Sequence, residues 1–186
     1  MAKLLYVANV SLDGYVEDAA GTFSWTEPGE EVFRFVTDLV RPVALALYGR
    51  RMYETMAVWE ADPRLGAQSA LMADFARTWQ AVDKIVYSTT LHSVWTTNTS
   101  LQRRFDPEAI SEMVAAANAD VTIGGAELAS AAFAAGLVDE VHLLTYPVVV
   151  GGGKPAIATD DRIALRLEDE QRFSDGVLYL RYSVEG

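Results

Sequence analysis

The sequence predicts an α/β fold, in which helices cover both faces of a largely parallel sheet and an antiparallel hairpin closes the chain. Two observations predict it. Short apolar runs rich in β-branched residues alternate with helical patterns through most of the chain, which is typical of α/β proteins. The chain then ends in two alternating strands, 164–173 and 177–184, joined by the turn Ser174-Asp175-Gly176. No repeat or long linker interrupts this order, so the 186 residues predict a single domain, 1–186.

The first predicted strand, Leu4–Val10, is an apolar run with β-branched and aromatic residues that ends before the turn signal Asp13-Gly14. Similar runs, each bounded by glycine, proline or polar residues, predict the other strands. These lie at 43–48, 84–88, 121–123 and 139–149, the last broken by Pro147, with a short edge strand around 94–96. We expect loops at 15–27, 58–68 and 151–153.

Helices are predicted where apolar residues recur every three or four positions between capping signals. Pro28 can open the first helix, and Glu30 and Glu31 suit its first turn because acids favour the positive end of the helix dipole. Its apolar spacing runs from Val32 to Val40. Further helices are expected at 50–57, 69–79, 107–117 and 127–135, the last closed by a glycine at 136.

The composition limits the partners that the protein can have. With 15 basic and 26 acidic residues, the net charge of -11 argues against nucleic acid or an anionic membrane as the main partner. No apolar run approaches the ~18 residues that a membrane helix needs. The short run Leu4–Ala8 is interpreted as a strand rather than a signal peptide. The absence of cysteine excludes disulfides and fits a reducing compartment, so we expect a cytoplasmic protein.

Two glycines, Gly124 and Gly125, lie between the predicted strand 121–123 and the next helix. The free N–H groups at a helix start attract anions, and residues without a Cβ let a phosphate approach the backbone. The alternative is a tight turn that needs unusual backbone angles and binds nothing. The pattern is not the Rossmann fingerprint, because Ala126 and Glu127 stand where further glycines would be needed.

A second strand-to-helix turn, at Gly49, is also a candidate anion site for the same reason. Arg50 and Arg51 begin the helix, where a cation is unfavourable unless an anion is bound. A solvated arginine pair is the alternative. A third strand ends in Ser88 and Thr89, hydroxyl groups at the carboxyl edge where open α/β sheets bind ligands. Together these turns suggest a ligand with more than one phosphate.

These stretches, in this order, resemble the dihydrofolate reductase fold. More closely, they resemble the reductase domain of the bifunctional riboflavin-biosynthesis deaminase-reductase and its stand-alone relatives. The segments that carry the resemblance are "NVSLDGYVED", "LYGRRMYETM", "DVTIGGAELASAAFAAGLVDEVHLLTYPVVVGGGKP" and the terminal strand pair, which together span nearly the whole chain.

The resemblance implies an NADPH-dependent reductase of a pterin-like or ribosylaminopyrimidine-like molecule, similar to 5-amino-6-(5-phosphoribosylamino)uracil reductase. The residues that would bind NADPH are Ala8, Gly49, Arg50, Arg51, Met52, Ser88, Thr89, Ile123, Gly124, Gly125, Ala126, Glu127 and Leu128. One of the two arginines would face the 2′-phosphate, and the peptide that joins the glycine pair would often be cis. Relatives of this kind also imply a homodimer joined through strand edges.

For proton transfer, the candidates are Asp13, Glu30 and Glu31, each of which can hold a water near the substrate. Trp25 is a candidate to stack on the small-molecule substrate, and the resemblance implies that Thr145 lies near it. No metal site is expected, because the two histidines lie far apart and no carboxylate pattern accompanies them. Two alternatives to the reductase stay open: a nucleotide-binding module without turnover, and a flavin-binding α/β protein.

Overall fold

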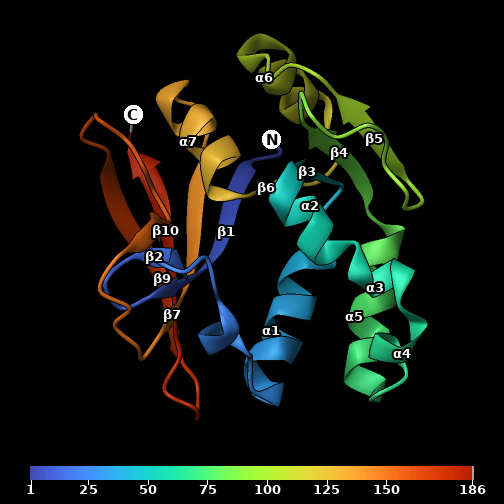
Figure 1. The fold of residues 1–186 in the computed structure, drawn as a ribbon. Helices are drawn as coiled ribbons and strands as arrows, with labels where there is room; N and C mark the ends of the chain where they lie inside the picture. Colours follow the sequence, from blue (N-terminus) through green and yellow to red (C-terminus); the bar gives the residue numbers. More distant parts are fainter. Residues whose placement is uncertain (186) are drawn as a thin grey trace.

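The computed structural model describes residues 1–185 and folds them around one eight-stranded sheet (Figure 1). Its strands are β1 (Leu4–Ser11), β3 (Leu45–Gly49), β4 (Asp83–Tyr87), β5 (Thr99–Gln102), β6 (Val121–Gly124), β7 (Glu140–Tyr146), β9 (Ala164–Arg172) and β10 (Leu178–Glu185). They lie side by side in the order β5-β4-β3-β6-β1-β7-β10-β9. Neighbours from β5 to β7 are parallel, whereas β10 is antiparallel to β7 and β9. The predicted α/β class with a C-terminal antiparallel hairpin is confirmed.

Helices cover both faces of this sheet. They are η1 (Ser24–Thr26), α1 (Glu30–Val40), α2 (Arg50–Met56), α3 (Val58–Ala61), α4 (Pro63–Gly66), α5 (Ala70–Ala81), α6 (Pro107–Ala116) and α7 (Ala126–Ala134). Ile110 of α6 and Phe133 of α7 pack into one apolar core with β1 and β6. On the other face, Phe75 and Trp79 of α5 share a core with β3 and with α1. The short helices α3 and α4 lie beside α5 (Figure 1).

The carboxyl ends of the parallel strands meet at one edge of the sheet, where β6 separates from β1. Tyr48 of β3 is level with Gly124 of β6. The pairing of β6 with β1 ends at Tyr6 beside Ile123, whereas β1 continues along β7 to Ser11. The backbone of β1 after Tyr6 therefore has a free edge on the β6 side. Openings at the carboxyl ends of strands are where open α/β sheets bind ligands.

A small two-stranded ribbon forms where loops were predicted. Its strands are β2 (Tyr15–Asp18) and β8 (Gly153–Pro155), which pair antiparallel with Glu17 opposite Lys154. Gly153 has a φ of 141°, and a Cβ on this residue would overlap the carbonyl oxygen of Glu17. Glycine therefore allows the ribbon to close. The loop prediction missed it because each partner is short and the two lie far apart in the sequence.

Three other element predictions are corrected by the structure. Residues 94–96 form no strand, because the N–H groups of Trp95 and Thr96 donate to the Tyr53 hydroxyl instead of to a ladder. The edge strand is β5, a few residues later. The loop predicted at 58–68 contains α3 and α4, and β7 ends at Tyr146 because Pro147 has no N–H to donate.

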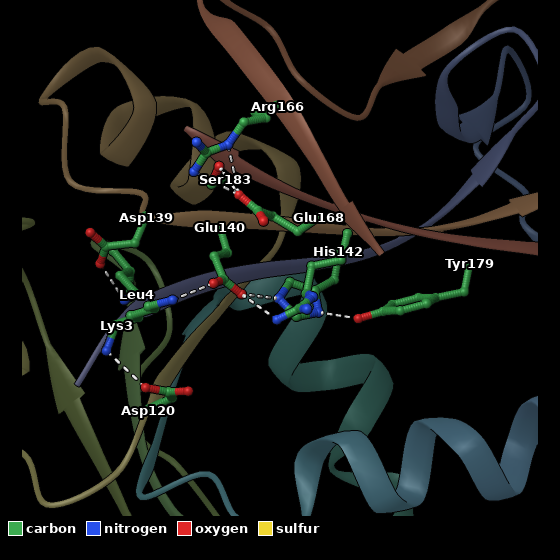
Figure 2. Close-up of polar contacts among 11 residues, drawn as sticks. Lys3, Leu4, Asp120, Asp139, Glu140, His142, Arg166, Glu168, Tyr179 and Ser183 are labelled. Atoms are coloured by element: carbon green, nitrogen blue, oxygen red, sulfur yellow. Dashed lines mark hydrogen bonds and ion pairs between the residues drawn. The ribbon is translucent and has the colours of Figure 1, made fainter. Parts of the chain in front are cut away.

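At the opposite, amino edge of the sheet, the exposed Lys3, which precedes β1, joins buried residues of β7 and β10 in a polar cluster (Figure 2). Glu140 accepts a hydrogen bond from Lys3 Nζ, and its Oε2 lies 3.1 Å from His142 Nε2. His142 Nδ1 lies 2.8 Å from the Tyr179 hydroxyl oxygen. His142 is thus held inside a satisfied network, and none of these four residues lines the cavity described below.

Candidate functional site

A cavity of about 840 Å³ opens at the carboxyl edge of the sheet. Its mouth is built by the ends of β3, β4 and β6, by the first residues of α2 and α7, and by the β2–β8 ribbon. From there the cavity extends between the sheet, α1 and α5. One continuous space therefore joins the glycine-marked turns to an interior of apolar side chains.

All the residues predicted to hold the cofactor line this cavity. They are Ala8, Gly49, Arg50, Arg51, Met52, Ser88, Thr89, Ile123, Gly124, Gly125, Ala126, Glu127 and Leu128. The parallel register brings them together from four strands, although the chain separates the first from the last by more than a hundred residues. Their role in cofactor binding stays a prediction, which the geometry permits.

Gly124 ends β6 and Gly125 precedes α7, and glycine is needed at each position for a different structural reason. Gly125 has a φ of 98°, a backbone conformation that side chains rarely adopt, and it begins α7 without a side-chain cap. A Cβ on Gly124 would lie 3.1 Å from the Tyr48 ring and 3.2 Å from Met52, so this glycine lets β6 pack closely on β3 and α2. The described residues contain no cis peptide bond, so the expected cis peptide at Gly124-Gly125 is wrong.

Charged side chains gather at the mouth of the cavity. Arg51 of α2 pairs with Glu17 of the ribbon at 3.4 Å, and Lys154 pairs with Glu127 of α7 at 2.9 Å. These two ion pairs tie the ribbon to the first turns of α2 and α7. Arg50 donates to Glu54 at 2.8 Å and to the Thr90 hydroxyl at 3.0 Å. The cations are therefore held at the mouth before any ligand arrives.

Arg103 is a cavity residue that the sequence analysis missed. It donates to the backbone oxygen of Ser88 at 3.1 Å and to that of His92 at 3.3 Å, so it fixes the turn after β4. A signal existed in the sequence, since a basic residue follows a short alternating run. Because the edge strand was predicted at 94–96 instead of at β5, Arg103 was not recognised as the residue that follows a strand at the carboxyl edge.

The interior of the cavity is apolar and aromatic. The rings of Phe33, Trp59 and Phe75 form its wall, with centroids 4.8 to 5.8 Å apart. Tyr146, at the end of β7, also lines the cavity. Its hydroxyl is buried and has no hydrogen-bond partner within residues 1–185, and burial raises its pKa to about 12. The hydroxyl is closed off from the open space, so other atoms of the Tyr146 side chain line the cavity.

The carboxylates predicted to assist proton transfer lie outside the cavity lining. Asp13 accepts from the N–H groups of Val150 and Gly151, and hydrogen bonds from Ser11 and this backbone hold its pKa below the usual value. Glu31 accepts from the N–H and hydroxyl of Ser174, which lowers its pKa in the same way. Glu30 is exposed at the start of α1. These positions do not support a catalytic role for the three carboxylates, and that role stays a prediction.

The predicted substrate contacts are not in the lining either. Trp25, in η1, packs edge-on against Tyr146 with ring centroids 6.2 Å apart, so it stands beside the cavity. Thr145 is level with Val10 of β1 and Leu178 of β10, and its side chain alternates to the face opposite Tyr146. Trp25 is adjacent to the interior, whereas Thr145 is directed away from it.

Within residues 1–185, no group of three histidine, cysteine or acidic side chains is arranged to hold a metal ion. The same residues include no helix with the length and apolar character needed to cross a membrane.

The fold and the cavity define an α/β protein whose parallel sheet opens onto a ligand-sized space lined by glycine turns and arginines. Residues 2–179 match the model of the RibD C-terminal domain, and the chain therefore belongs to the RibD C-terminal domain family. The resemblance to the reductase domain of the riboflavin-biosynthesis deaminase-reductase is thereby confirmed.

Individual relatives are distant in sequence. The uncharacterized protein YyaP of Bacillus subtilis (strain 168) is 26% identical over 179 residues, which are 95% of this chain and 92% of YyaP. A putative riboflavin biosynthesis protein from Shewanella sp. PV-4 has a TM-score of 0.77 at 18% identity, over 99% of both chains. The diaminohydroxyphosphoribosylaminopyrimidine deaminase/5-amino-6-(5-phosphoribosylamino)uracil reductase of Thermotoga maritima has a TM-score of 0.64 at 12% identity, over 99% of this chain and 57% of that protein. At such identities the structural matches show the fold alone.

Proposed function

We propose that the protein is an NADPH-dependent reductase of a small conjugated molecule. Membership of the RibD C-terminal domain family supports a pyrimidine reductase-like role. The cavity supports it independently, because backbone amides and cations line one part of it while apolar and aromatic side chains line another. A hydride-transfer site needs both parts, since the reacting rings must be kept away from water while the phosphates are held.

The residues at the mouth fit a dinucleotide. Gly124 and Gly125 leave the start of α7 without Cβ atoms, and α7 has no side-chain cap on its free N–H groups. Arg50, Arg51 and Arg103 offer guanidinium groups that match phosphate oxygens. NADPH bound there would supply the hydride, and this chain would supply position, exclusion of water and charge.

The observation that carries the proposal is the local reversal of charge. The protein has a net charge of -11, yet the side chains that line the cavity include four cations and only two carboxylates, Glu17 and Glu127. Each of these carboxylates pairs with a lining cation, and Arg50 also pairs with Glu54, so the mouth keeps a small excess of positive charge. An acidic protein that concentrates cations around two glycine-marked turns is suited to bind an anion at that place.

The test is a calorimetric titration of NADPH and NADH into the protein and into an Arg50→Ala, Arg51→Ala double variant. We expect NADPH to bind more tightly than NADH, and the double variant to lose far more affinity for NADPH. The matched control is Arg64→Ala, Arg77→Ala, which removes the same charge from two exposed arginines outside the cavity. Equal losses for both cofactors, or an equal loss in the control, would contradict the assignment.

Two other functions are distinguished by a turnover assay and by the absorbance spectrum of the purified protein. A nucleotide-binding module without turnover would bind NADPH but would not oxidise it with any substrate offered. A flavin-binding protein would be yellow when purified and would show flavin absorbance. A cytoplasmic location and a homodimer stay expectations, and the dimer is checked by light scattering.

A further inference from the structure

One part of the cavity leads away from the glycine turns, between β3, α1 and α5. We call it the apolar channel, and its lining residues, which all belong to one apolar cluster, are Phe33, Val36, Val40, Ala46, Phe75 and Trp79. The lining follows β3 from Val43, which precedes the strand, to Gly49 at its carboxyl end. At about 3.3 Å per residue this path is roughly 20 Å long. The channel therefore runs from the mouth toward the amino edge of the sheet.

Helix α1 presents apolar side chains on two stripes, and one of them faces the channel. Phe33, Val36 and Val40 recur three and four residues apart, and all three are half-buried and line the channel. They span about 10 Å of helix at 1.5 Å per residue. Val32, on the neighbouring stripe, is fully buried in a separate cluster with residues of β7 and β10. One stripe therefore anchors the helix, while the other keeps apolar surface toward the channel.

The walls of the channel carry no charge. Within the described residues 1–185, no charged side chain of β3, α1 or α5 lines the cavity. The charged lining residues come from the ribbon, from the first turns of α2 and α7, and from Arg103 after β5. The indole Nε1 of Trp79 already donates to the Tyr48 hydroxyl at 3.2 Å. A charged group in the channel would therefore be desolvated without compensation, whereas an apolar group would gain by leaving water.

The cofactor proposed above would leave the channel to another molecule. Its phosphates need the glycine turn before α7, at the carboxyl edge of the sheet, and the channel leads away from that edge. Apolar walls give affinity mainly through the apolar area that they remove from water. The molecule that fits this part of the cavity is therefore the second reactant, and the part of it that fits is apolar.

We propose that the apolar channel binds an uncharged apolar tail of the substrate, so that the reductase acts on a ring that carries such a tail. The inference rests on the reductase proposed above and names the substrate class of that site. A tail that ends in a phosphate would find no cation on β3, α1 or α5 within residues 1–185. An apolar tail would instead contact Phe33, Val36 and Phe75 along the channel.

The test uses alcohols as probes of the tail alone. The probes 1-butanol, 1-hexanol and 1-octanol differ only in chain length. Diethylene glycol monoethyl ether has as many heavy atoms as 1-octanol, but ether oxygens interrupt its chain. NADP⁺ is titrated first, since its binding judges the proposed reductase separately. Each probe is then titrated by calorimetry into the NADP⁺-saturated protein, or into the protein alone if NADP⁺ does not bind.

We expect the affinity to rise by roughly two- to fourfold for each added methylene, and 1-octanol to bind at least roughly tenfold more tightly than the ether. Val36→Phe places a ring in the channel, so it should weaken 1-octanol by at least roughly tenfold and leave NADP⁺ affinity unchanged. Its melting temperature should not fall, because the ring enters the channel rather than a packed core. The matched control is Val58→Phe, at an exposed valine outside the cavity lining, which should change neither affinity.

Several results would overturn the proposal. They are no binding of any alcohol, equal affinity for 1-butanol and 1-octanol, equal affinity for the ether and 1-octanol, and unchanged 1-octanol affinity in Val36→Phe. A lowered melting temperature for Val36→Phe would also count against it, since the side chain would then lie in a packed core. If NADP⁺ binds while these results are found, the cofactor site stands and only the substrate class fails. If the alcohols bind in the expected order but NADP⁺ does not bind, the channel stands and the reductase fails.

Discussion

His142 Nε2 lies 3.1 Å from Glu140 Oε2, and both side chains are buried on β7 at the edge of the sheet away from the cavity (Figure 2). A carboxylate can only accept, so His142 donates through Nε2 and accepts from the Tyr179 hydroxyl through Nδ1. The neutral imidazole therefore satisfies every partner. Protonation would put a second N–H against the Tyr179 hydroxyl, which would then need another acceptor.

Stability is expected to fall as the pH drops through the range in which a free histidine titrates. Burial lowers the pKa of His142, and this outweighs the opposing pull of Glu140. The unfolded chain then binds a proton at a higher pH than the folded chain, so the free energy of unfolding decreases from about pH 6.5 downward. The measurement is the urea midpoint at pH 7.5, 6.5 and 5.5.

The variant that isolates this effect is His142→Gln, which cannot titrate and should flatten the pH dependence between pH 7.5 and 5.5. His92→Gln is the control, because His92 is the other histidine of the chain and is exposed. At lower pH a second loss follows: although burial alone would raise it, the pKa of Glu140 is lowered by the hydrogen bonds from Lys3 and His142. An unchanged slope in His142→Gln would assign the pH dependence to other groups.

The left-handed turn before α7 gives a second prediction. Gly125→Ala forces a residue with a Cβ to a φ of 98°, which costs about 1–2 kcal/mol of stability, and the new Cβ lies 3.5 Å from Met52. The same change places a methyl group between the turns of β3 and β6, so NADPH affinity should also fall by at least roughly tenfold. Thermal unfolding and calorimetric titration measure the two effects.

Gly136→Ala is the matched control for this variant. Gly136 also has a positive φ, 66°, but a Cβ there meets nothing within 4 Å, and the residue lies beyond the far end of α7. Its stability should fall by a similar amount without a change in cofactor affinity. If both variants lose cofactor affinity equally, the loss reflects general destabilisation rather than the turn.

Glu31 gives a prediction that separates a structural from a catalytic carboxylate. Its contacts with the N–H and hydroxyl of Ser174 join α1 to the β9–β10 turn, so Glu31→Gln should lower the melting temperature. Reductase activity per folded molecule should stay within roughly twofold, because Glu31 lies outside the cavity lining. Removing a general acid–base group would usually lower activity far more than this. Ser174→Ala, which removes the hydroxyl partner, should lower the melting temperature in the same direction. A loss of activity of roughly a hundredfold or more in Glu31→Gln would restore the catalytic role.

The glycine turns were predictable from sequence because their signal is local. A strand, Gly124-Gly125 and a helix follow one another between residues 121 and 134. The positive φ at Gly125 also favours glycine at that position, so the residue type itself is informative. The alternation of elements fixes the fold class for the same reason. The carboxyl ends of parallel strands lie at the same edge of a sheet, so the position of Ser88 after β4 predicted that it would lie near the glycine turns.

The remaining lining residues depend on contacts between distant segments. Lys154 reaches the cavity because the ribbon pairs β2 with β8, and nothing in either short segment indicates that pairing. Tyr146 was passed over in favour of its neighbour Thr145, since the sequence alone does not fix which side chain of a buried strand faces a cavity and which faces the opposite core. Whether Glu30 and Glu31 of α1 line the cavity was not predictable for a similar reason, because the rotation of the helix about its axis decides which residues face it.

Tyr53 also depends on distant contacts, and it gives the last prediction. Its buried hydroxyl oxygen accepts from the N–H of Trp95 at 2.8 Å and from that of Thr96 at 3.2 Å, and so holds the connection that leads into β5. Tyr53→Phe removes this acceptor and leaves both N–H groups without it, so the free energy of unfolding should fall by about 1–3 kcal/mol. Tyr182→Phe, on a half-buried tyrosine whose hydroxyl bonds to nothing within residues 1–185, should change it by less than about 0.5 kcal/mol. Urea unfolding followed by circular dichroism compares the two, and equal midpoints would show that the hydroxyl does not hold this connection.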